Sequence, residues 1–168
     1  MDRPKILVVF YSRSGNTRRI AQALAETLRS DLEEITEPKS RTGFLGYMRS
    51  AMEALQKRPA AIAAKQRDVA AYDLVIVGTP VWGSSLSSPV RAYLMATAAQ
   101  LPDVAFFCSL GGMGSDSTFA QMTAIVGKKA RAVCAIRQKD VEARTYSGLL
   151  TTFETALSAT SNAGLAKV

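Results

Sequence analysis

Hydroxyl and amide side chains crowd into one short run near the N-terminus, where they could bind an anion. The run consists of Ser12, Arg13, Ser14, Gly15, Asn16 and Thr17. An apolar strand pattern over residues 5–11 precedes it, and apolar residues at helical spacing follow it. The first turn of a helix offers unpaired backbone N–H groups and partial positive charge. We predict that this run holds a phosphate, although an ordinary helix N-cap would use the same residue types.

A second run surrounds the only tryptophan of the chain. It consists of Thr79, Pro80, Val81, Trp82 and Gly83, and it follows an apolar strand pattern over residues 73–78. We expect a loop here, with the indole exposed at the end of the strand. A flat amphipathic ring in that place suits stacking on another flat ring. The alternative is that Trp82 is a core residue.

A third run is rich in glycine and follows the apolar residues 104–108. Its residues of interest are Ser109, Leu110, Gly111, Gly112 and Gly114. Glycines expose backbone N–H and C=O groups that could meet the polar edge of a ligand. Their spacing and position differ from those of a dinucleotide-binding fingerprint. The alternative is that they only form a turn.

Strand and helix patterns alternate along the whole chain. We expect strands over residues 5–11, 32–35, 73–78, 104–109 and 130–136, and helices over 15–30, 44–57, from 88, about 119–126 and 149–159. Residues 138–147 read as polar loop, and the tail from residue 160 reads as frayed. This alternation predicts one α/β domain over residues 1–168, a three-layer doubly wound sheet of five parallel strands in the order 2-1-3-4-5. The three runs should then meet at the carboxyl ends of the strands.

Composition excludes several kinds of chemistry. The chain has no histidine, which removes histidine-based triads and most zinc sites. Its two cysteines, Cys108 and Cys134, lie in separate apolar runs and are expected to be buried free thiols. We therefore predict no catalytic side chain and no metal site, and we expect any redox chemistry to need a bound cofactor.

The net charge of +7 is concentrated in one segment. Between residues 39 and 67 a single acid, Glu53, accompanies the basic residues Lys39, Arg41, Arg49, Lys57, Arg58, Lys65 and Arg67. Such a segment can attract an acidic partner or a phosphorylated ligand, or it can be a solvated surface. Without a nucleic-acid motif, we do not expect nucleic acid as a partner. No apolar run is long enough to span a bilayer, and no signal-peptide pattern precedes residue 5, so we expect a cytoplasmic location.

Together these runs resemble those of the flavodoxin family. The resemblance extends from about residue 5 to residue 159 and is carried by residues 12–17, 79–83, 88–91 and 109–112. It implies one non-covalently bound FMN, with residues 12–17 at the phosphate, 79–83 beside the isoalloxazine and 109–114 at its pyrimidine edge. The chain departs from electron-carrier flavodoxins in being basic, and it has Leu110 and Met113 where they usually have an aromatic residue.

The resemblance favours an FMN-binding redox protein that transfers electrons between protein partners. The alternative is a reductase in which NAD(P)H reduces FMN and a quinone or another small acceptor reoxidises it. A third interpretation is a non-redox module that binds a phosphate-bearing ligand. A carrier needs an exposed flavin edge, whereas a reductase needs a pocket over the ring, which residues 39–67 could supply. The sequence leaves the oligomeric state open.

Overall fold

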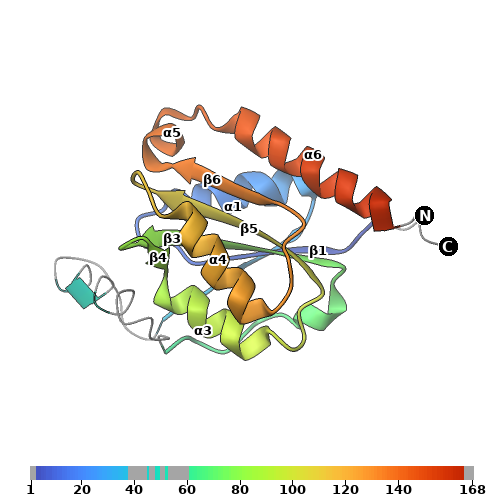
Figure 1. Ribbon diagram of the computed structural model, residues 1–168, viewed down its shortest axis with the longest axis horizontal. Helices are drawn as coiled ribbons and strands as arrows, with labels where there is room; N and C mark the ends of the chain where they lie inside the picture. The colour runs from blue at the N-terminus through green and yellow to red at the C-terminus, as the bar shows by residue number, and fades with distance from the viewer. Residues whose placement is uncertain (1–2, 38–44, 46–47, 50–51, 53–60, 165–168) are drawn as a thin grey trace.

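A parallel β-sheet with helices on both faces forms the body of the protein (Figure 1). The computed structural model describes residues 3–37, 45, 48–49, 52 and 61–164. The five parallel strands are β1 (Ile6–Phe10), β2 (Asp31–Glu34), β3 (Leu74–Trp82), β5 (Asp103–Leu110) and β6 (Val133–Arg137). Their order is β2-β1-β3-β5-β6, which confirms the predicted fold class and strand order. The short strand β4 (Ser85–Leu86) pairs antiparallel with β3 outside this path.

The helices divide between the two faces of the sheet (Figure 1). They are α1 (Asn16–Leu28), α3 (Ser88–Thr97), α4 (Ser115–Val126), α5 (Gln138–Ala143) and α6 (Ser147–Gly164), with a 3-10 turn, η1 (Val69–Ala71). Side chains of α3 and α4 pack in one buried cluster, whereas those of α1, α5 and α6 pack in the other. The protein therefore has the three predicted layers.

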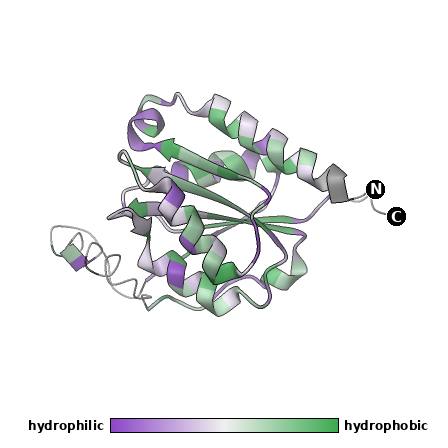
Figure 2. Ribbon diagram, viewed as in Figure 1, coloured by the Kyte–Doolittle hydropathy of each residue, from purple (hydrophilic) through white to green (hydrophobic). Residues whose placement is uncertain are grey.

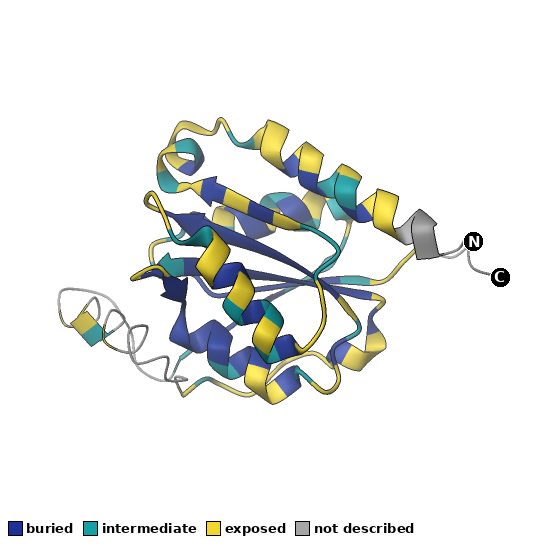
Figure 3. Cartoon of the chain, viewed as in Figure 1, coloured by how far each residue is buried: buried dark blue, intermediate teal, exposed yellow. Residues whose placement is uncertain are grey.

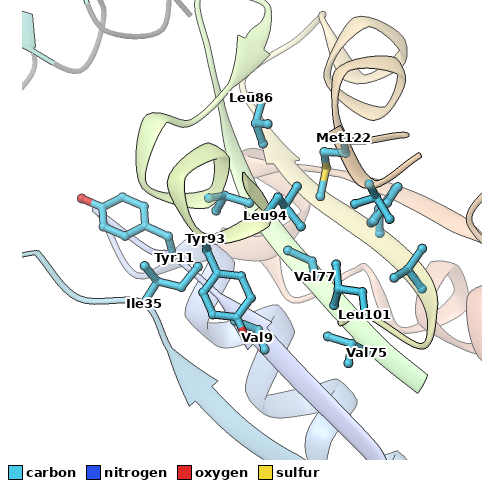
Figure 4. Close-up of a cluster of buried hydrophobic side chains, with 14 of the residues drawn as sticks. Val9, Tyr11, Ile35, Val75, Val77, Leu86, Tyr93, Leu94, Leu101 and Met122 are labelled. Carbon is cyan, nitrogen blue, oxygen red and sulfur yellow. The ribbon is translucent and has the colours of Figure 1, made fainter. Parts of the chain in front are cut away.

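Alternate residues of each strand enter the two clusters, because successive side chains of a strand point to opposite faces. Leu7 and Val9 of β1 pack under α3, whereas Val8 and Phe10 pack under α1. Apolar residues fill the sheet and the inward faces of the helices, and exposed residues lie on the outer faces (Figures 2 and 3). Figure 4 shows the α3 side of this core, where Tyr93 is only 1% exposed.

Strand β3 is longer than the sequence predicts. Residues 79–82, expected to be loop, continue the strand, because Pro80 lies in register with Ser109 and Val81 with Leu86. Gly83 and Ser84 form the two-residue turn to β4, with φ angles of 54° and 57°. Positive φ at both central residues is what a type I′ hairpin turn requires. The second run is thus the end of a strand and a tight hairpin.

Two expectations for the C-terminal third were wrong. Residues 138–143 form helix α5 rather than polar loop, with Val141 fully buried as its anchor against α1 and α6. Helix α6 begins at Ser147 and continues to Gly164, so it includes residues expected to be frayed tail. The helix expected over residues 44–57 lies largely outside the described residues, although Leu45, Met48, Arg49 and Met52 are helical.

The part of the chain that the structure describes contains neither a membrane-spanning helix nor a metal-binding cluster. None of its helices combines the length and apolar character needed to cross a bilayer. No group of three or more His, Cys, Asp or Glu side chains in these ranges is placed to hold a metal ion.

Candidate functional site

The first run forms an uncapped helix N-terminus. Gly15 is the N-cap of α1 with φ of 96°, a left-handed conformation that glycine adopts without strain. No side chain caps the helix, and its first turn contains no acidic residue. Gly15 N–H donates instead to Ser12 Oγ at 3.1 Å. The N–H groups of Asn16 and Thr17 have no acceptor within the helix, so they are available to an anion.

Hydroxyl and amide side chains surround this helix N-terminus. Ser12, Asn16 and Thr17 are 8%, 8% and 2% exposed, whereas Ser14 is exposed to solvent. Thr17 Oγ1 lies 2.8 Å from Ser109 Oγ, which joins the first run to the end of β5. The structure thus brings together two residues that are 92 positions apart in the sequence.

The tryptophan of the second run is buried, contrary to the expectation of an exposed ring. Trp82 is 8% exposed and belongs to the core cluster on the α3 side. Its indole stands edge-on to the Tyr11 ring, with centroids 5.6 Å apart and planes at 90°. The guanidinium carbon of Arg13 lies over the indole, 5.9 Å from its centroid. The Arg13 contact links the first run to the second, and the Tyr11 contact ties Trp82 to the residue just before the first run.

The remaining residues of the second run have different surroundings. Thr79 is fully buried, and its Oγ1 lies 2.8 Å from Ser87 Oγ, so its hydroxyl joins β3 to the start of α3. Pro80 is also buried, and Val81 is half-buried. Only Gly83, in the hairpin turn, is exposed. The surface that this run offers to a ligand is therefore mainly the backbone of the turn.

The third run begins buried and ends exposed. Ser109 and Leu110 are 2% and 5% exposed, whereas Gly111 and Gly112 are exposed. Met113 is 79% exposed. The run therefore presents glycine backbone and one flexible apolar side chain to solvent, beside the hairpin turn of the second run.

Helix α4 offers a second helix N-terminus at the same end of the sheet. Its N-cap, Gly114, is also left-handed and carries no side-chain cap, but Asp116 lies in the first turn. A carboxylate there already interacts with the positive end of the helix dipole and repels an added anion. Arg18 and Arg19 occupy the first turn of α1 instead. Helix α1 is therefore the better anion site of the two.

A buried arginine below the hairpin, Arg91, has no role among the sequence-based predictions. Arg91 of α3 is 7% exposed, and its Nη2 donates to Gln121 Oε1 of α4 at 2.5 Å. Ser85 Oγ of β4 donates to the same oxygen at 2.8 Å. Burial lowers the pKa of the Arg91 guanidinium. The cluster ties β4 to both helices. The sequence feature that could have indicated it is an arginine in an otherwise apolar helix face.

The described end of the basic segment 39–67, at Lys65 and Arg67, lies away from the three runs. Arg67 pairs with Asp31 at the start of β2, with an N···O distance of 3.3 Å. Lys65 Nζ donates to Gln100 Oε1 at 3.4 Å, beyond the end of α3. Both contacts lie toward the amino ends of the strands. The other members expected to form the patch, except Arg49, lie outside the described residues.

The three runs meet at the carboxyl ends of β1, β3 and β5, as predicted. This geometry, a doubly wound parallel sheet with an uncapped α1 N-terminus at its switch point, defines a class of α/β proteins that bind phosphate-bearing ligands. The family model described as flavodoxin matches residues 5–128. The chain belongs to the flavodoxin family. Membership confirms the predicted class, an FMN-binding flavodoxin-like redox protein.

Solved structures show the same fold at low sequence identity. A flavoprotein of Lactobacillus acidophilus NCFM, solved in complex with FMN, is 23% identical with a TM-score of 0.67, covering 86% of this chain and 99% of that one. A flavoprotein of Bacteroides eggerthii is 22% identical with a TM-score of 0.71, covering 84% and 95%. A WrbA-like flavodoxin of Agrobacterium tumefaciens is 18% identical with a TM-score of 0.59, covering 98% and 99%.

Proposed function

We propose that this chain holds the phosphate of FMN at the N-terminus of α1 and passes electrons between the flavin and protein partners. The observation that carries the proposal is the α1 N-terminus itself, which has a left-handed glycine N-cap, no side-chain cap and no acid in its first turn. The structural likeness to the FMN complex of the Lactobacillus acidophilus flavoprotein supports the choice of ligand. The bound flavin would supply the electron-transfer chemistry.

The donors at this position fit a phosphate. The backbone N–H groups of Asn16 and Thr17 join the side chains of Ser12, Ser14 and Thr17 as its ligands. Hydrogen bonds to a charged acceptor are roughly twice as strong as neutral ones, so the phosphate anchors the cofactor. Arg13, which belongs to the same run, adds a positive charge near the phosphate.

The isoalloxazine lies between the hairpin turn and the third run. Both sides there offer exposed backbone, from Gly83 on one side and from Gly111 and Gly112 on the other. Backbone N–H and C=O groups from Val81, Gly83 and Leu110 through Gly114 contact the ring. Trp82 lies beneath the turn, with Thr79 and Pro80 in the strand that carries it.

An exposed surface around this position favours a carrier over a reductase. Met113 is 79% exposed, and the glycines beside it are exposed as well. An electron carrier needs a flavin edge that its partners can approach. The net charge of +7 favours an acidic redox protein as that partner, because complementary charge accelerates encounter. The proposed location remains the cytoplasm.

The test is anaerobic mixing of the FMN-loaded protein with NADH or NADPH, in which the flavin absorption bands report reduction. A carrier should keep its oxidised spectrum for minutes, while dithionite bleaches it at once. Rapid bleaching by either nucleotide would contradict the carrier and favour the reductase. A purified protein that is colourless and binds no added FMN would contradict the proposal as a whole.

A further inference from the structure

We infer that Ser109 is a positioning residue that turns the Thr17 hydroxyl toward the FMN phosphate. The inference rests on the proposed function, in which Thr17 is a phosphate ligand. It changes the role expected for Ser109, which the resemblance to flavodoxins implies is at the pyrimidine edge of the ring.

The contact between the two hydroxyls is short and buried. Thr17 Oγ1 and Ser109 Oγ lie 2.8 Å apart, and either oxygen could be the donor. Both residues are 2% exposed, so bulk water does not compete for the bond. A hydroxyl has one proton to donate and can accept two hydrogen bonds. The pair therefore has two arrangements, which differ in which residue donates.

A bound phosphate selects one of these arrangements. When Thr17 donates its only proton to a phosphate oxygen, it has none left for Ser109. Ser109 must then donate to Thr17 Oγ1, since its own proton is the only one remaining in the pair. Hydrogen bonds in a chain polarise one another, so donation by Ser109 strengthens the Thr17 bond to the anion.

The strand geometry places the Ser109 side chain on the α1 side of the sheet. Phe107, two residues earlier in β5, packs in the cluster under α1, whereas Cys108 and Leu110 pack on the α3 side. Side chains two residues apart in a strand share a face. Ser109 thus points toward α1, while the exposed backbone of Gly111 and Gly112 lies beyond it.

A double-mutant cycle with two ligands tests the inference. Dissociation constants for FMN and riboflavin are measured by calorimetry for the wild type, Ser109→Ala, Thr17→Ala and the double variant. We expect Ser109→Ala to raise the dissociation constant of FMN about three- to tenfold and that of riboflavin less than about twofold. In the Thr17→Ala background the same change should have almost no effect on FMN. The control is Thr118→Val, which removes another fully buried hydroxyl, one without a partner, and should leave both affinities unchanged.

Two results would overturn the inference while leaving the proposed function intact. One is an equal loss of affinity for FMN and for riboflavin that persists in the Thr17→Ala background. This result would place Ser109 at the ring. The other is no loss of FMN affinity in a folded Ser109→Ala protein. If that variant does not fold, Ser109→Cys keeps most of the side-chain volume but is a weaker hydrogen-bond donor. It should weaken the binding of FMN more than that of riboflavin. A wild type that binds neither flavin would contradict the proposed function itself, and the inference with it.

Discussion

A β-carbon placed on Gly114 would lie 2.6 Å from Cα of Ser84, so the start of α4 touches the β3–β4 turn backbone to backbone. The φ of Gly114 is also +99°, which side-chain-bearing residues rarely adopt. Both observations require glycine at this position. The contact fixes the distance between the hairpin turn and the third run, which are the two sides of the proposed ring site.

Replacing this glycine should therefore weaken both folding and flavin binding. We expect Gly114→Ala to lower the free energy of unfolding by about 1–3 kcal/mol, because alanine is strained at positive φ and its methyl group collides with backbone. Urea unfolding measures the stability, and flavin titration measures the affinity. The matched control is Gly148→Ala, at a glycine outside the proposed ring site where an added β-carbon meets nothing within 4 Å. Equal effects of the two substitutions would show that the Ser84 contact does not position the site.

Trp82 provides a single-site fluorescence probe, because the chain has only one tryptophan. We expect strong quenching of its emission when FMN binds, since Trp82 adjoins Gly83 of the hairpin turn, which is one side of the proposed ring site. Trp82→Ala removes the ring contact with Tyr11 that supports the hairpin. It should therefore weaken the binding of FMN and of riboflavin by similar amounts, about 0.5–1.5 kcal/mol. Unchanged emission at saturating FMN would contradict the placement of the ring beside the hairpin.

The sheet order could be predicted from the sequence because buried strand patterns alternate with helical ones. That alternation also placed the three runs at one end of the sheet. The contacts within the site could not be predicted in the same way. Trp82 is buried by Tyr11, which is distant in sequence, and Ser109 meets Thr17 across 92 positions. Local residue types carry no information about such pairs.

The short elements were missed for a different reason. Strand β4 has two residues, too few for a periodic pattern, although a Gly-Ser turn after a strand is a recognised hairpin signal. Helix α5 has six residues and only one buried anchor, Val141, so its sequence looks like polar loop. Its fold depends on tertiary packing against α1 and α6 rather than on local propensity.

The two cysteines should make the protein less stable in alkali. Burial raises the pKa of Cys108 to about 12 and that of Cys134 to about 11. The unfolded thiols ionise near pH 8.5, so the stabilisation is complete below that pH and is lost as the pH rises toward the folded values. We expect the free energy of unfolding to fall by about 1.4 kcal/mol per thiol at about pH 9.5.

Urea unfolding of the wild type and of a Cys108→Ala, Cys134→Ala double variant measures this loss. The double variant should show a flatter dependence of stability on pH above about pH 8.5. In the folded wild type neither thiol should react with a thiol reagent at neutral pH, because both are buried and protonated. If the stability of the two proteins falls with pH in parallel, the buried thiols are not the cause of the alkaline loss.

The position of the phosphate is the central claim, and amide chemical shifts test it most directly. Backbone N–H resonances are followed by NMR while FMN, riboflavin or inorganic phosphate is added to the protein. We predict large shifts at Asn16 and Thr17 with FMN, smaller ones with inorganic phosphate and little change with riboflavin, whereas Gly111 and Gly112 should shift with both flavins. Shifts with FMN at Ser115 and Asp116 of α4, with Asn16 and Thr17 unmoved, would contradict the account.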